Sequence, residues 1–321
     1  MDAAASSLRA LPLFERLASC RRILIAGAGG GFDVFAGLPL YLALRADGKD
    51  VFLANLTFTP LEQTDARYLA PHLAEVTVET TGAERYFPER RLAEWFAHRG
   101  EAVSVYTFEK TGVVHLRQAY ELLARELRLD AVVLVDGGTD ILMRGDEAGL
   151  GTPEEDMASL AAASRLEVAQ KLVVCLGFGI DTFHGVCHAH FLENVAALTR
   201  DGGFLGAFSV LPSMPEAQGF LAAVEYAHQH TPTRPSIVNG SIAAAVRGEF
   251  GNVQFTTRTA GSELFVSPLM AIYFGFELDS IVRRSLYLPH LEGTKTIFEV
   301  SARIEAFRHS ITTRPPRAIP H

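Results

Sequence analysis

The residues best suited to chemistry are aspartates that directly follow apolar, strand-like runs. Asp136 and Asp140 follow the apolar run 131–135, and Asp181 follows the apolar run 172–176. Carboxylates at strand ends can bind a hard cation such as Mg²⁺ or Mn²⁺, accept hydroxyl groups of a ligand, or transfer protons if burial raises a pKa. We therefore predict that Asp136 and Asp140 act as acid–base groups or, if the protein uses a metal ion, as its ligands.

A third apolar run, 22–26, ends in a turn that contains four glycines and is followed by Asp33. N–H groups at the start of a helix attract anions, and glycines let a ligand approach the backbone. We expect this turn to bind a phosphate, a carboxylate or another anionic part of a small ligand, with Asp33 closer to a hydroxyl group than to the anion. The alternative is a turn whose glycines serve packing alone.

The same turn does not match the dinucleotide fingerprint. The pair Gly27 and Gly29 is not followed by the third glycine of the motif, because Phe32 stands in that position. The next predicted strand ends near Asn55, where no acid is present to bind a ribose hydroxyl. An enzyme that uses NAD or S-adenosylmethionine is therefore only a second alternative.

A histidine-rich segment follows the turn that carries Asp181. His184 and His188 are four residues apart and would share one face of a helix. Zinc binding is disfavoured, because Gly185 lies between them and no glutamate takes the position found in zinc hydrolases. We interpret one or both imidazoles as proton-transfer or hydrogen-bonding groups, with helix capping or plain surface exposure as the alternative.

Each of the three apolar runs is followed by a glycine-containing turn, at 27–31, 137–138 and 177–179. The candidate site combines these three glycine turns with the polar groups beside them. Arg144 would offset negative charge on a leaving group. The acids at 154–156 are instead expected in the first turn of a helix, whose dipole favours them. The predicted catalytic residues are Asp136, Asp140, Asp181, His184, His188 and Arg144. The predicted ligand-binding residues are Gly27, Gly29, Gly30, Gly31, Asp33, Asn55, Gly137, Gly138, Thr139, Gly177 and Gly179.

Composition limits the partners of the chain. Its 321 residues are 48% hydrophobic and 21% charged, as in a globular protein with a sizeable core. The net charge of −8 disfavours nucleic acid as a partner, because binding phosphates requires a basic surface. No apolar stretch reaches the roughly 20 residues of a membrane span. Three scattered cysteines do not suggest a disulfide framework, so we expect a cytoplasmic protein.

Predicted strands and helices alternate along the chain, which favours a Rossmann-like, mostly parallel sheet with helices on both faces. We expect one elaborated α/β domain over residues 1–310 and a C-terminal tail without packing signals over residues 311–321. The apolar segments 266–282 and 295–308 are expected to form core or interface helices. Because the first of them is rich in large apolar groups, we predict a homodimer, with a buried core helix as the alternative.

These motifs together resemble an uncharacterised family, domain of unknown function 1152 (DUF1152), found in archaea and bacteria. The resemblance covers most of the chain to about residue 310 and implies no established activity. One short segment, 136–141, is also similar to the Gly-Asp-Gly-Gly-Asn-Glu turn of D-glutamate cyclases. The residues that carry the family resemblance are 27–33, 55–57, 136–147, 151–153 and 177–181.

The residue pattern favours an enzyme that acts on a nucleotide-like or phosphorylated small molecule. Hydrolase, lyase or transferase chemistry would depend on the carboxylates, with Mg²⁺ or Mn²⁺ as an optional cofactor. No Gly-x-Ser-x-Gly elbow is present to suggest a serine nucleophile. The first alternative is a non-catalytic protein that binds or senses a small ligand such as a nucleotide.

Overall fold

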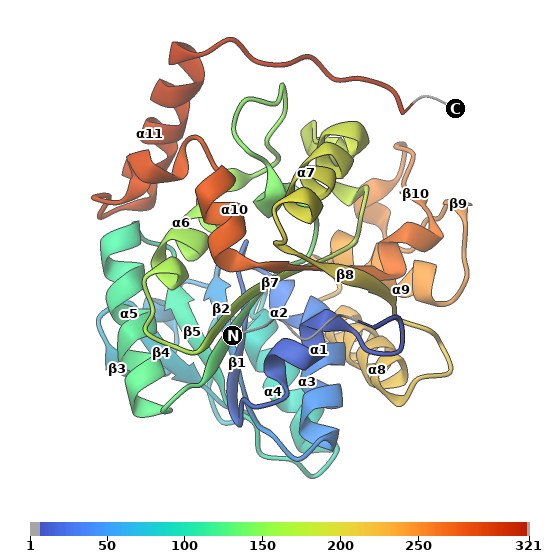
Figure 1. Ribbon diagram of the computed structural model, residues 1–321. Helices are drawn as coiled ribbons and strands as arrows, with labels where there is room; N and C mark the ends of the chain where they lie inside the picture. The colour runs from blue at the N-terminus through green and yellow to red at the C-terminus, as the bar shows by residue number, and fades with distance from the viewer. Residues whose placement is uncertain (1–6, 320–321) are drawn as a thin grey trace.

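A nine-stranded sheet lies at the centre of residues 7–319, the part of the chain that the computed structural model describes (Figure 1). Its strand order is β3-β4-β5-β2-β1-β6-β7-β11-β8. The five central strands, from β5 to β7, are parallel, and each strand outside them pairs antiparallel with its inner neighbour. The strands are β1 (Arg22–Gly27), β2 (Asp50–Thr57), β3 (Arg67–Ala70), β4 (Leu73–Val76), β5 (Val105–Glu109), β6 (Ala131–Asp136), β7 (Gln170–Leu176), β8 (Phe204–Ser209) and β11 (Ile272–Glu277).

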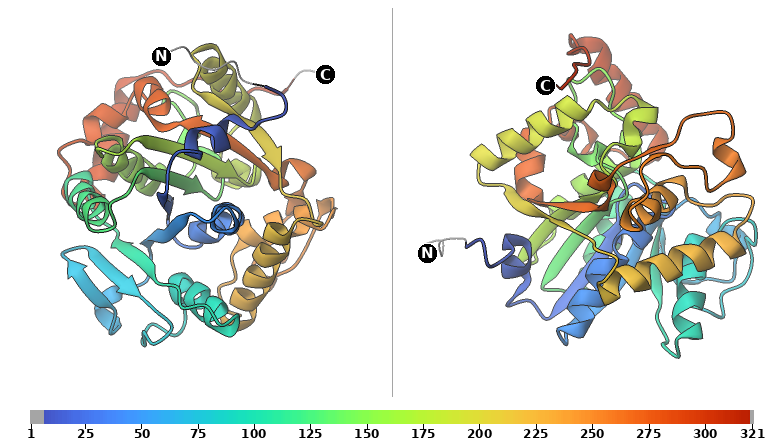
Figure 2. Two further views of the ribbon diagram at one scale, coloured as in Figure 1. Left: turned by 60° about the horizontal axis from the view of Figure 1, so that its bottom comes forward. Right: turned by 90° about the vertical axis from the view of Figure 1, so that its right-hand side faces the viewer.

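Helices cover both faces of this sheet (Figures 1 and 2), and the prediction of a Rossmann-like α/β fold is confirmed. One layer consists of α1 (Pro12–Leu17), α2 (Asp33–Ala36), α3 (Leu38–Ala46), α4 (Pro88–His98), α8 (Pro215–His230) and α9 (Ile237–Val246). The other consists of α5 (Val113–Glu126), α6 (Pro153–Ser164), α7 (His188–Arg200), α10 (Leu278–Arg284) and α11 (Ile297–Ser310). Two further short strands, β9 (Gly251–Asn252) and β10 (Phe265–Val266), form a separate ribbon.

The central strands are apolar throughout because both of their faces are buried. Along β1, Ile23 and Ile25 pack into one core, whereas Leu24 and Ala26 pack into the other. In β6 all six residues are buried, including the terminal Asp136. Continuous apolar runs of this kind are typical of parallel strands between two helical layers. At their carboxyl ends, these apolar strands are followed directly by polar turns.

The expectation of a helix over 266–282 is wrong. The segment contains β11, which pairs antiparallel with β7 on one side and with β8 on the other, and then α10. An apolar run bounded by turns can be a buried strand as well as a buried helix, and only length separates the two. Tyr273 and Phe276 are buried in the core, although Leu269 is 45% exposed. The core thus accounts for most of the apolar groups that suggested a homodimer, which stays a prediction without that support.

The chain after residue 310 also differs from the expected tail, because it is attached to the domain. Arg314 pairs with Asp146 at 2.9 Å and with Glu193 at 2.6 Å, and its backbone N–H donates to the Asp146 carbonyl. Arg308, on α11, donates to the carbonyls of Gly145, Glu147 and Ala148. The end of the chain therefore fastens the loop 144–148. None of the helices within residues 7–319 is long and apolar enough to cross a membrane.

Replacing Arg308 by alanine should lower the free energy of unfolding by about 2 kcal/mol, the scale of hydrogen bonds to a charged group. The loss follows because three carbonyls of the 144–148 loop would lose their donor. Urea unfolding followed by circular dichroism measures it. Arg303→Ala on the same helix is the matched control, since Arg303 is exposed. Equal stability of the two variants would contradict a fastening role for Arg308.

Candidate active site

Sheet order brings the three glycine turns to one place. Strands β1, β6 and β7 are parallel neighbours, so their carboxyl ends lie side by side. The Ala28 N–H, in the first turn, donates to the Val135 carbonyl of β6 at 2.8 Å. The turn after β6 continues into the 3-10 helix η2 (Asp140–Leu142), and the turn after β7 continues into η3 (Ile180–His184). The three turns therefore lie together at the carboxyl ends of these strands, as predicted, and a ligand-binding crevice there stays a prediction.

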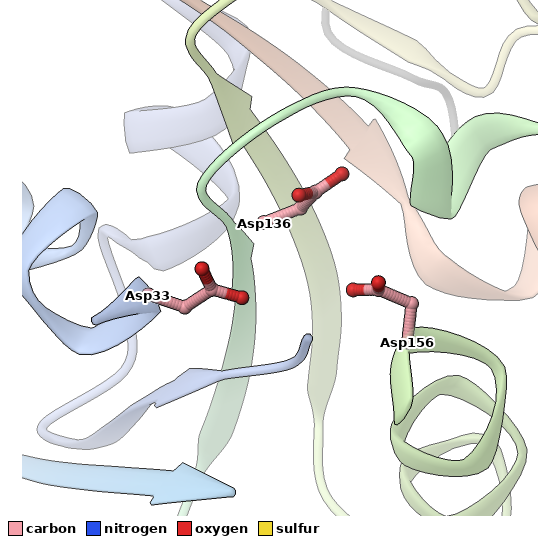
Figure 3. A group of neighbouring side chains, drawn as sticks. All are labelled: Asp33, Asp136 and Asp156. Carbon is pink, nitrogen blue, oxygen red and sulfur yellow. The ribbon is translucent and has the colours of Figure 1, made fainter. Parts of the chain in front are cut away.

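Three aspartates bring their carboxylates close together beyond the carboxyl ends of these strands (Figure 3). Asp33 comes from the first turn of α2, Asp136 from the end of β6 and Asp156 from the first turns of α6. One carboxylate oxygen of each lies within 4.8 Å of the corresponding oxygens of the other two. Oxygen atoms so arranged suit a hard cation such as Mg²⁺ or Mn²⁺.

Two further aspartates, Asp140 and Asp181, border this trio. A Cβ atom at Gly138 would lie 2.7 Å from a carboxylate oxygen of Asp181 and 3.0 Å from one of Asp136, so glycine is required between them. Asp140 is 4% exposed and Asp181 7% exposed. Together with the trio they form the aspartate cluster: Asp33, Asp136, Asp140, Asp156 and Asp181.

Backbone N–H groups orient four members of the aspartate cluster. The donor and acceptor pairs are Gly29 to Asp33 at 2.8 Å, Ile141 to Asp136 at 3.2 Å, Thr152 to Asp140 at 2.8 Å and Thr139 to Asp181 at 2.6 Å. Asp156 differs, because its Oδ1 atom is buried and has no hydrogen-bond partner among the described residues. A buried, unpaired carboxylate oxygen is costly unless something binds it.

Burial raises the pKa of every carboxyl group in the aspartate cluster, and mutual repulsion adds to the effect. The pKa of Asp33 rises to about 8, first because of burial and then because of the charge on Asp140. Burial and then Asp140 also raise the pKa of Asp136, Asp156 and Asp181 well above their ordinary values. Five carboxylates this close cannot all be ionised near neutral pH unless positive charge joins them.

Comparison with known sequences confirms the resemblance to the DUF1152 family. The sequence profile of the family described as "Protein of unknown function (DUF1152)" matches residues 24–313. The chain belongs to this family. The matched range contains all five residues of the aspartate cluster. No curated protein shows a significant match to the chain.

In this DUF1152 protein, the glycines of the first turn, 27–31, face different neighbours. A Cβ at Gly29 would lie 2.8 Å from an Asp156 oxygen, so this residue faces the acids, and its N–H already serves Asp33. An anion there would be repelled in the absence of a cation. Gly30 and Gly31 have positive φ angles of 91° and 62°, and they face Phe58 and Tyr86 instead. Gly30 and Gly31 are buried, and Phe58 and Tyr86 cover them, whereas Gly29 is half-buried.

Other predicted ligand-binding residues support the first glycine turn from behind. The Asn55 amide donates to the Gly31 carbonyl at 2.8 Å and to Glu89 at 2.7 Å, and both side chains are fully buried. Burial raises the pKa of Glu89 to about 7. A Cβ at Gly27 would collide with the Asn55 side chain. These residues hold the turn in shape, and the ligand has no direct route to them.

The remaining small residues fill distinct positions around the aspartate cluster. Gly137 lies beside Asp33, since a Cβ there would be 2.7 Å from its Oδ1 atom. The Thr139 hydroxyl lies 3.2 Å from Asp181. Gly177 packs near Ile242, in the wall of the core. Both Gly177 and Gly179 have positive φ angles, which lets the chain turn sharply after β7.

The two predicted histidines are exposed and follow the turn after β7 in this DUF1152 protein. His184 ends η3. Burial raises the pKa of Asp140, whereas hydrogen bonds from Thr152 and, to a lesser degree, the nearby His184 lower it. His188 begins α7 and stacks on Phe178 with ring centroids 4.9 Å apart. The two side chains do not share one helix, because Gly185 ends η3 with a positive φ. Of the two, His184 is the one that interacts with an aspartate of the cluster.

Arg144 is not directed at the aspartate cluster. Its guanidinium lies 3.3 Å from Asp146, and its backbone N–H donates to Glu147 at 3.0 Å. The chain turns away between η2 and this residue, and Gly145 continues the turn with a φ of 116°. Arg144 therefore belongs to the loop that the C-terminal residues fasten, and the predicted contact with a leaving group has no support from its position.

Asp156 is the principal site residue that the sequence did not indicate. It stands third in an acidic run at the start of α6, where helix capping explains acids well. The three acids have different partners: Glu154 accepts from Ser301 at 3.0 Å, Glu155 pairs with Lys110, and Asp156 faces the cluster. Successive helical residues point about 100° apart, so one acid of such a run can enter a site while its neighbours do not.

Proposed function

We propose that this DUF1152 protein is an enzyme that hydrolyses, or transfers a group from, a nucleotide-like or phosphorylated small molecule with the help of a divalent cation. The observation that carries the proposal is the buried, unpartnered Oδ1 atom of Asp156, whose carboxylate lies close to those of Asp33 and Asp136. A structural role alone does not explain a carboxylate left unpaired beside two others. A cation explains it, because all three would then gain a positive partner.

The division of roles follows from position. Asp33, Asp136 and Asp156 would hold Mg²⁺ or Mn²⁺, and the cation would neutralise charge on the substrate and make a bound water more acidic. Asp140, oriented by Thr152 and influenced by His184, is the proposed proton acceptor. Asp181 is held by Thr139 and borders the same space. Its proposed role is to orient the attacking water.

Hydrolysis would then proceed in one balanced step. The water oxygen forms a bond with phosphorus while the bond from phosphorus to the leaving oxygen breaks. Asp140 accepts the proton that the water loses, and the leaving oxygen receives a proton from His184 or from solvent. Transfer to another acceptor would follow the same course, with a substrate hydroxyl in place of water.

Cation binding and turnover test the proposal separately. Titration of the metal-free protein with Mn²⁺, followed by electron paramagnetic resonance, should show binding that Asp156→Asn weakens at least about 10-fold, the scale for groups that hold a metal ion. Release of inorganic phosphate from a panel of nucleotides and sugar phosphates should require Mg²⁺ or Mn²⁺. Glu154→Gln is the matched control, since Glu154 lies on the same helix but contacts Ser301.

Each part of the test can fail on its own. If Asp156→Asn binds Mn²⁺ as tightly as the unmodified protein, the proposed ligands are wrong. If the cation binds as expected and no compound in the panel is altered, a ligand-binding or sensor role replaces catalysis. Mass spectrometry of small molecules that co-purify with the protein would then identify the ligand.

A further inference from the structure

A cavity opens beside the aspartate cluster, on the side of the glycine turn that does not face the acids. Its volume is about 790 Å³, which is sufficient for a nucleotide. Phe58 and Tyr86 form part of its lining, and these are the same two side chains that Gly30 and Gly31 face. The cavity and the aspartate cluster are thus on either side of one short turn.

Aromatic surface is available in this cavity. Phe58 is 47% exposed, although it directly follows the buried strand β2, and the Lys110 ammonium lies 5.2 Å from its ring centroid. The Tyr86 ring packs edge-on against Phe32, and its hydroxyl is directed at Gly31. An exposed phenylalanine beside a polar site is a typical surface for stacking a planar ring.

Two arginines line the cavity beside the same aromatic groups. Arg85 and Arg234 line the cavity, are exposed, and form no ion pair within residues 7–319. Arg258 lies close enough that its charge, with that of Arg234, lowers the pKa of Tyr86 against burial. Asp33 acts on the same hydroxyl in the opposite direction. Tyr86 therefore lies between the acidic cluster and the arginines.

We infer that this cavity binds a nucleotide, with the base against Phe58 and Tyr86 and with phosphate oxygens at Arg85 and Arg234. The inference rests on the proposed function and names its substrate class. Unpaired guanidinium groups in a chain of net charge −8 favour an anionic ligand, and arginine suits phosphate in particular. Gly30 and Gly31 separate the cavity from Asp33 and Asp156, and Phe58 and Tyr86 fill the space in front of these two glycines. The phosphoryl group to be attacked would therefore reach the acids once one of these two side chains moves aside.

Binding without metal separates this inference from the proposed function. In EDTA, calorimetric titration with AMP, GMP, CMP and UMP should show binding of at least one nucleotide. The corresponding nucleoside and inorganic phosphate should each bind at least about 10-fold more weakly, because each makes only part of the contacts. Phe58→Ala and Arg234→Gln should each weaken nucleotide binding by about 10-fold or more. Both side chains are exposed, so the variants are expected to fold.

Two control variants test whether the nucleotide binds in this cavity. Glu154→Gln should leave nucleotide binding in EDTA unchanged, because Glu154 contacts Ser301 and lies outside both the cavity and the aspartate cluster. Arg303→Gln removes one exposed positive charge on α11 and should have no effect. Binding that Phe58→Ala and Arg234→Gln leave intact would overturn the cavity assignment. The absence of binding by all four nucleotides would overturn the nucleotide assignment, even if another phosphorylated compound proved to be hydrolysed.

Discussion

Replacing Asp136 by asparagine is expected to lower turnover at least about 10²-fold while the fold is kept. The asparagine side-chain oxygen can still accept from the Ile141 N–H, so the side chain should stay in place. Its negative charge is lost, however, and with it the attraction for a cation shared with Asp33 and Asp156. Asp140→Asn should have an effect of similar size, because an amide cannot accept the proton from water.

Steady-state turnover of both variants, with circular dichroism spectra to check folding, measures the effect. Glu154→Gln serves again as the control, since it removes a neighbouring acid outside the cluster. Full activity of both aspartate variants would refute the assigned roles. A loss confined to Asp136→Asn would retain the cation site and require another proton acceptor, for which Asp181 is the nearest candidate.

The stability of the metal-free protein should fall as the pH rises from about 5 to about 8. Asp33 has an ordinary pKa of 3.8 when unfolded and a pKa of about 8 when folded, so between these values the folded state binds more protons. The stabilisation that comes from protonated Asp33 is therefore fully present below its pKa in the unfolded chain, and it is lost as the pH rises through its pKa in the folded protein. The raised pKa values of Asp136, Asp156 and Asp181 act in the same direction.

Thermal unfolding at several pH values in EDTA measures this fall. A tenfold change in proton affinity corresponds to about 1.4 kcal/mol, so even a roughly hundredfold change over the whole cluster would lower the melting temperature by several degrees. Mg²⁺ or Mn²⁺ should restore most of the loss at pH 8 and little at pH 5. Asp156→Asn should melt higher than the unmodified protein in EDTA at pH 8 and gain less from the cation. A melting temperature that does not change with pH in EDTA would mean that the negative charge of the aspartate cluster is already neutralised.

The meeting of the three glycine turns could be predicted from the sequence because buried parallel strands are apolar from end to end. Each such run, as at 131–135, marks where a strand stops, and the polar residues after it must lie at the same edge of the sheet. The fold class and the grouping of Asp33, Asp136 and Asp181 follow from that rule. No comparable rule locates a residue that joins the aspartate cluster from another element.

The features that the sequence did not predict depend on contacts between distant parts of the chain. Asp156 enters from a helix, where its acidic neighbours and the helix dipole give an adequate local explanation. The segment containing β11 has the apolar length of a helix, and only the free edge of β7 makes it a strand. Arg144 follows the Asp136 turn closely in sequence, but the chain reverses before its side chain, which pairs with Asp146. Phe58 and Arg234 are brought to one cavity from distant parts of the chain.

The position of β11 also affects how the chain can assemble during synthesis. β8 is made long before β11 but pairs only with it, so about sixty residues must emerge before β8 can join the sheet. Until then β7, which carries the turn with Asp181, is an unpaired and apolar sheet edge, a surface on which growing chains can associate. A chaperone that shields strand edges would therefore be most useful to this protein late in translation, after the three glycine turns have already been synthesised.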